Sequence, residues 1–174
     1  MQFTILKLIY FSGHEISHGF DDKGVMYDSL GNKKSLYSNS GLKALQNVSN
    51  CLRHQYSAYN LNGRWLDGNF TLTENIADHG ALRIAEIAFE KRLRNNHNSD
   101  EMIPGLTAKQ SFYIWFTKHD CRHYPENFIG LDPHSPNKFR VNGPLKNSAK
   151  FAETWGCKSG TPMNPKNKCS FWGI

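Results

Sequence analysis

The sequence FSGHEISHGF, residues 11–20, decides how the rest of the chain is interpreted, because it holds two histidines four positions apart. Residues four apart lie on one face of an α-helix, so His14 and His18 can direct their imidazoles at one metal ion. Glu15 lies beside them, and HExxH on a helix is typical of a zinc site in which the glutamate is a general base. Zinc takes three or four ligands, so a further ligand is needed. The alternative is an ordinary helix with two surface histidines.

The segment TENIAD, residues 73–78, offers that further ligand. Glu74 and Asp78 are four apart, so they share one face of a predicted helix. This face could supply a carboxylate ligand and a second carboxylate behind the ligands. The rival interpretation is a capping box, because residues 71–74 match the pattern S/T-x-x-E, in which the glutamate turns back to the first amides of its own helix.

Helical periodicity and breaker residues predict a mainly α fold with long loops and little sheet. Apolar residues recur at helical spacing in five segments, which predicts helices over about residues 3–19, 41–59, 72–94, 108–123 and 145–155. Loops are predicted over residues 21–40, 60–69 and 124–144, the last of which contains four prolines and two glycines. No alternation of apolar and polar residues is regular enough to predict a strand.

The apolar run over residues 1–11 has about the length of a signal-peptide core. Lys7 interrupts the run, and no small-x-small cleavage site follows it. We therefore interpret it as the apolar first half of the HExxH helix. It is too short to span a bilayer, so no membrane segment is predicted in this chain.

Length and composition favour one globular domain over residues 1–174. The chain has a formal charge of +6 and a pI near 9.2. The basic residues are scattered, and the densest cluster, Lys91, Arg92 and Arg94, lies on a predicted helix that also carries Glu86 and Glu90. Because no basic stripe is interleaved with aromatic residues, a nucleic-acid partner is not expected.

The four cysteines form no C-x-x-C pair, so thiolate metal binding is not expected, and disulfides or free thiols both stay open. Glycosylation sequons begin at Asn47 and Asn69. Together, the cysteines and sequons favour an oxidising, extracellular setting.

A second polar group lies in the proline-rich loop, where the sequence DPHSP covers residues 132–136 and Arg140 follows six residues after His134. Flanking prolines restrict the backbone around this histidine, which suits a residue that must meet a transition state. An exposed loop histidine without a function is the alternative.

Five motifs in order resemble the neprilysin and endothelin-converting-enzyme family of zinc metalloendopeptidases. They are HEISHGFDD (14–22), ENIAD (74–78), PHSP (133–136), FR (139–140) and MNP (163–165). The resemblance runs from about Gly13 to near the C-terminus. It implies the C-terminal catalytic part of a thermolysin-like zincin, or gluzincin, without the family's N-terminal lobe. Members of the family are often membrane-anchored, which implies an extracellular protein or the ectodomain of a plasma-membrane protein.

The resemblance also implies roles for single residues. His14, His18 and Glu74 correspond to the ligands of one zinc ion per chain, and Glu15 corresponds to the general base acting on a zinc-activated water. Asp78 would orient a ligand histidine and is often called the proton donor. Asp21 matches a second acidic partner behind the ligands. His134 would donate to the oxyanion, and Arg140 would bind a substrate carbonyl.

The expected function is therefore hydrolysis of peptide bonds in oligopeptide substrates. The alternative is a zinc-binding domain without catalysis. The resemblance further implies a Cys51–Cys169 disulfide within the chain, whereas Cys121 and Cys157 would pair with the family's N-terminal part.

Overall fold

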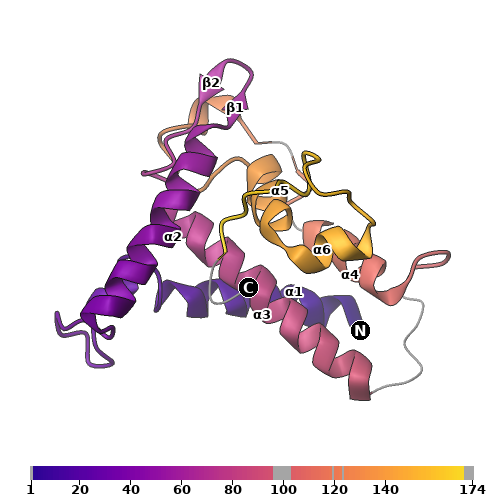
Figure 1. The fold of residues 1–174 in the computed structure, drawn as a ribbon, viewed down its shortest axis with the longest axis horizontal. Coiled ribbons are helices and arrows are strands. Elements are labelled where there is room, and N and C mark those ends of the chain that lie inside the picture. Colours follow the sequence, from indigo (N-terminus) through magenta and orange to yellow (C-terminus); the bar gives the residue numbers. More distant parts are fainter. Residues whose placement is uncertain (1, 96–102, 119, 123, 171–174) are drawn as a thin grey trace.

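The computed structural model describes residues 2–95, 103–118, 120–122 and 124–170. Its elements, in chain order, are helix α1 (Gln2–His18), 3-10 turn η1 (Gly24–Met26), helix α2 (Asn39–Ser57), strands β1 (Asn60–Leu61) and β2 (Arg64–Trp65), helices α3 (Leu72–Asn95) and α4 (Ala108–Lys118), 3-10 turn η2 (Glu126–Phe128), and helices α5 (Asn137–Asn147) and α6 (Ala149–Thr154). Figure 1 shows a helical molecule in which one short hairpin stands at the end of α2. The prediction of a mainly α fold is confirmed.

Helices α1 and α3 form the central packed pair of the molecule (Figure 1). Small residues allow this packing, because a Cβ at Gly13 would lie 3.3 Å from the Ala81 Cα. Ala77 and Ala81 are buried on the facing side of α3. Because the two helices lie this close, the HExxH segment of α1 faces the side of α3 on which Glu74 lies.

Two apolar clusters hold the other helices against this pair. The first joins α1, α3, α4 and α5, with Phe151 of α6 packed against it, and in this cluster the rings of Phe89 and Phe112 stack with centroids 4.7 Å apart. The second joins α2, α3 and α5 around the fully buried Tyr56. Each large apolar side chain buried in such a cluster contributes about 1.5–3 kcal/mol.

The predicted Cys51–Cys169 disulfide is confirmed and lies at the edge of the second cluster. Its sequence separation is 118 residues. In the chain-entropy model a loop of this length contributes about 4–5 kcal/mol to stability. Cys121 and Cys157 carry free thiols.

The predicted loop over residues 124–144 and the predicted helix over 145–155 are wrong in their bounds. Helix α5 begins at Asn137 and includes Pro144, and Ser148 then caps a separate helix α6 by accepting a hydrogen bond from the Phe151 amide. The prolines misled the prediction because Pro136 precedes α5 as its N-cap residue, with φ of −52° and ψ of 141°, where the helix needs no amide hydrogen bond from it. The residue Arg140 is therefore held by a helix and not by a loop.

Two smaller expectations also change. The predicted loop over 60–69 contains the hairpin β1–β2, whose turn residues Asn62 and Gly63 have φ values of 50° and 90°. Asn-Gly is the strongest short sequence signal for such a turn, so the hairpin could have been predicted from the sequence. Helix α4 ends at Lys118, before a turn at Asp120, although the prediction extended it to His123, which lies outside the described residues.

In the part of the chain that the structure describes, no helix has the length and apolarity to cross a membrane.

Candidate metal centre

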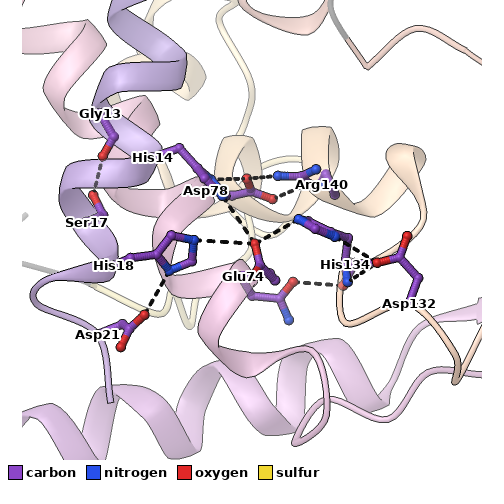
Figure 2. A network of polar contacts seen from close by, with 12 residues as sticks. Gly13, His14, Ser17, His18, Asp21, Glu74, Asp78, Asp132, His134 and Arg140 are labelled. Atoms are coloured by element: carbon purple, nitrogen blue, oxygen red, sulfur yellow. Dashed lines mark hydrogen bonds and ion pairs between the residues drawn. The ribbon is translucent and has the colours of Figure 1, made fainter. Parts of the chain in front are cut away.

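The side chains of His14, His18 and Glu74 converge between α1 and α3 (Figure 2). One ligand atom from each residue lies within 4.8 Å of the other two. Glu74 Oε2 is 3.2 Å from His14 Nε2 and 3.6 Å from His18 Nε2. Two imidazole nitrogens and a carboxylate oxygen in this arrangement are a donor set that suits a tetrahedral metal such as zinc.

Each histidine has a carboxylate at its other ring nitrogen. His18 Nδ1 is 2.9 Å from Asp21 Oδ2, and His14 Nδ1 is 3.0 Å from Asp78 Oδ1, an ion-pair contact whose direction departs from that of a good hydrogen bond. Burial lowers the pKa of His14, but the contacts with Asp78 and Glu74 outweigh burial and raise the pKa to about 9. These carboxylates turn both Nε2 atoms toward Glu74, which is how second partners commonly orient metal-binding histidines.

The position of Asp21 depends on the tight turn that follows α1. Its Oδ1 accepts hydrogen bonds from the amides of Lys23 and Gly24, at 2.8 and 2.7 Å. A Cβ at Gly24 would overlap the carbonyl oxygen of His18. Glycine at this position therefore lets the chain fold back and place the buried Asp21 carboxylate behind His18.

The capping-box interpretation of Glu74 is not what the structure shows. The Thr71 amide, which a capping glutamate would accept from, donates to the Asp67 carbonyl at 3.1 Å. The Glu74 carboxylate instead faces three imidazoles, those of His14, His18 and His134. Burial raises the pKa of Glu74, but the histidines outweigh burial and hold this pKa well below its usual range.

Asp78 is fully buried and forms the centre of a wider polar network (Figure 2). The Arg140 guanidinium binds it through two hydrogen bonds, Nε to Oδ2 at 2.9 Å and Nη2 to Oδ1 at 2.7 Å. Tyr10, one turn before His14 on α1, also donates to Oδ1, at 2.9 Å. Burial raises the pKa of Asp78, but the arginine outweighs burial and keeps the carboxylate ionised.

His134 lies in the loop before α5, between two carboxylates. Its Nε2 is 3.0 Å from Glu74 Oε2, and its Nδ1 is 2.7 Å from Asp132 Oδ1. The contact with Glu74, partly offset by burial, raises the pKa of His134. The next residue, Ser135, donates to the buried Asn75 at 2.8 Å and so ties this loop to α3.

Glu15 is the predicted site residue that the structure does not join to the network. It is exposed on α1 and makes no polar contact with another described residue. Sequence reasoning gave no role to Asp132, Asn75 or Tyr10. The pattern Asp-x-His at residues 132–134 could have indicated Asp132, and the position next to Glu74 could have indicated Asn75. Nothing in the sequence pattern indicated Tyr10.

A hollow of about 350 Å³ lies beside His134. The hollow is open to solvent and is bordered by the hairpin, the turn before α3 and the loop before α5. Trp65 and Phe70 at this hollow are large apolar side chains that are 67% and 42% exposed. Exposed aromatic residues next to a hollow and a polar cluster are typical of a ligand site.

The sequence model of Peptidase family M13 matches residues 10–171 of the chain. Endothelin-converting enzyme 1 of Homo sapiens is 42% identical over 166 residues, which are 92% of this chain and 21% of that protein. Neprilysin-3 of Drosophila melanogaster is 41% identical over 167 residues, again 92% of this chain and 21% of the relative. The chain thus spans about a fifth of the length of these curated relatives.

Among solved structures, the chain is similar to the zinc metalloprotease Zmp1 of Mycobacterium tuberculosis in complex with an inhibitor. The TM-score is 0.85 with 29% sequence identity, over 94% of this chain and 27% of the Zmp1 chain. This likeness confirms the predicted fold class, the catalytic part of a helical zincin.

Proposed function

The chain belongs to Peptidase family M13, and on this premise we propose that it is the catalytic region of a zinc-dependent metalloendopeptidase that hydrolyses oligopeptides. The observation that carries the proposal is the convergence of His14, His18 and Glu74 within 4.8 Å. A chance cluster of polar side chains would not also place a carboxylate behind each histidine.

The donor set fits zinc on two counts. Imidazole nitrogen and carboxylate oxygen are both good zinc ligands, and three protein ligands leave a position open for substrate or water. Each histidine keeps its remaining nitrogen on a carboxylate, which makes the ring a better donor and fixes its tautomer. We assign one zinc ion to each chain.

When bound, zinc would polarise the scissile carbonyl and lower the pKa of a water molecule toward neutrality. Glu15 is the residue that we assign as general base. Its carboxylate is exposed one residue after His14 and has no described partner to compete for a proton. An accessible carboxylate of this kind can take a proton from the attacking water and pass it to the leaving amine.

The remaining polar residues would bind and orient the substrate. We assign His134 as the donor to the oxyanion, because its Nε2 faces the ligand cluster while Asp132 holds Nδ1. Arg140 uses Nε and Nη2 on Asp78, so the N–H groups of Nη1 could donate a hydrogen bond to a substrate carbonyl. Asp78 and Asp21 would act through the two ligand histidines.

Peptides are the substrate class that the surroundings of the cluster favour. The hollow beside His134 has an aromatic border formed by Trp65 and Phe70, which suits a peptide side chain. We assign no nucleic-acid partner. The Cys51–Cys169 disulfide supports a location outside the reducing cytosol, which we also propose for this chain.

The test measures zinc content of the purified chain by mass spectrometry and cleavage of a quenched fluorescent peptide. We expect about one zinc per chain, loss of zinc in Glu74→Ala, and retained zinc but no cleavage in Glu15→Gln. Glu90→Ala, which removes a carboxylate of α3 that pairs with Lys150 outside the cluster, is the matched control and should behave as wild type.

A folded chain without zinc would contradict the proposed metal site. Zinc binding without cleavage by the wild-type chain would contradict catalysis by this chain alone and would favour a zinc-binding role.

A further inference from the structure

Tyr10 is a buried tyrosine whose hydroxyl reaches the polar network behind the ligand cluster. Its side chain is 3% exposed, and its ring packs edge-on against Phe116 with centroids 5.1 Å apart. The hydroxyl donates to Asp78 Oδ1 at 2.9 Å. Burial, reinforced by Asp78, raises the pKa of Tyr10 far above neutrality, so the phenol stays a hydrogen-bond donor.

The oxygen that Tyr10 holds is the one that faces the ligand histidine. Asp78 Oδ1 is shared by the Tyr10 hydroxyl, Arg140 Nη2 at 2.7 Å and His14 Nδ1 at 3.0 Å. Arg140 approaches from α5, whereas Tyr10 and His14 are four residues apart on α1 and therefore lie one above the other. Tyr10 thus fixes the distance between Asp78 and the helix that carries His14.

We propose that Tyr10 is a positioning residue of the metal centre, whose hydroxyl holds Asp78 Oδ1 against His14 and thereby fixes the orientation of this ligand. The proposal rests on the proposed function, since it takes a metal ion at His14 as given. Removing the hydroxyl leaves a buried carboxylate oxygen short of one donor, which is costly and is relieved by movement of the carboxylate. The His14 ring would then be held less firmly.

The test compares the zinc affinity of the full chain with that of Tyr10→Phe, by competition with a chelator of known affinity. Phenylalanine keeps the ring against Phe116 and removes only the donor. Removing the direct partner of a ligand histidine typically lowers metal affinity by about 10–100-fold. Removing Tyr10, which acts one step further out, should therefore lower zinc affinity by about 3–10-fold. The matched control is Tyr113→Phe, because Tyr113 donates to the buried Glu86 at 2.8 Å, away from the metal ligands.

A double-mutant cycle that combines Tyr10→Phe with Asp78→Asn tests whether Tyr10 acts through Asp78. In the Asp78→Asn background, Tyr10→Phe should change zinc affinity by less than about twofold, because the charged acceptor is already gone. Circular dichroism and thermal unfolding of the metal-free variants give the readout for a purely structural role. Tyr10→Phe and Tyr113→Phe should lower the unfolding temperature alike, while only Tyr10→Phe weakens zinc binding.

Equal zinc affinities of wild type and Tyr10→Phe would overturn the inference, and so would equal losses in Tyr10→Phe and Tyr113→Phe. A Tyr10→Phe chain that does not fold would also contradict it, because the hydroxyl would then serve the core. Absence of zinc from the wild-type chain is a different result, since it would contradict the proposed function itself.

Discussion

Two buried carboxylates on helix α3, Asp78 and Glu86, have the same kind of tyrosine partner but opposite electrostatics. Asp78 accepts from Tyr10 at 2.9 Å, and Glu86 accepts from Tyr113 at 2.8 Å. Both side chains lie in the interior, and they are little more than two helical turns apart. Burial and a tyrosine hydroxyl therefore do not distinguish them.

Their charged partners do distinguish them. Asp78 binds the Arg140 guanidinium with two hydrogen bonds, and its pKa is held well below the usual range although burial acts to raise it. Among the described residues, Glu86 accepts from two hydroxyls, those of Tyr113 and Ser148, and burial raises its pKa.

The comparison shows where a permanent charge is needed. At Asp78 the arginine keeps the carboxylate charged beside His14, which we propose as a zinc ligand, and the charge can orient this ring. At Glu86 the carboxylate ties α3 to α4 and to the start of α6, which a neutral group could do as well. Replacing each carboxylate by its amide therefore tests the comparison directly.

Asp78→Asn should have the largest effect. The amide leaves the Arg140 cation in the interior without its counter-charge, which typically costs about 3–5 kcal/mol. Urea unfolding of the metal-free chain at pH 7 measures this loss, with Lys138→Met, a change of an exposed cation on the same helix as Arg140, as the control. A loss below about 1 kcal/mol would mean that the pair is not the organising interaction of this region.

Asp21→Asn should weaken zinc binding by about 10–100-fold, because Asp21 is the partner of His18, the second histidine that we propose as a zinc ligand. Asparagine keeps Oδ1, which accepts from the amides of Lys23 and Gly24, so the turn should survive. The substitution replaces Oδ2 by an NH2 group, which cannot accept a hydrogen bond from His18 Nδ1. Chelator competition measures the affinity, and Glu86→Gln should leave it unchanged. Equal affinities of Asp21→Asn and wild type would remove Asp21 from the metal centre.

Much of the candidate site was predictable from spacing alone. His14 with His18, and Glu74 with Asp78, are pairs four residues apart, and helix geometry fixes how such pairs lie. Resemblance then supplied what spacing could not, namely that these two helices meet. The contact between them depends on Gly13 and Ala81, whose small size has no distinctive signal in the sequence.

The parts that sequence reasoning missed are those that tertiary packing decides. The predicted loop over residues 124–144 places Arg140 outside any helix because prolines commonly break helices, yet Pro136 is the N-cap residue of α5 and Pro144 lies within this helix. The Arg140–Asp78 pair joins residues 62 positions apart, and the Tyr10–Asp78 bond joins residues 68 apart. No local pattern encodes such a distance.

Glu86→Gln should have the smallest effect and the opposite sign. Because burial raises the folded-state pKa of Glu86 above its ordinary value of 4.5, the folded chain binds this proton more tightly than the unfolded chain. Wild-type stability should therefore fall as the pH rises from about 4.5 through the raised pKa. Glutamine carries no such proton and keeps Oε1, the acceptor of both hydroxyl hydrogen bonds.

Relative to wild type, Glu86→Gln should thus gain stability as the pH rises from 4.5 to 7. Urea unfolding at several pH values measures the difference. Glu90→Gln is the control, because Glu90 pairs with Lys150 at the surface and should lose at most about 1 kcal/mol. If Glu86→Gln instead lost stability at pH 7 as Asp78→Asn does, Glu86 would also need its charge, and the contrast between the two carboxylates would fail.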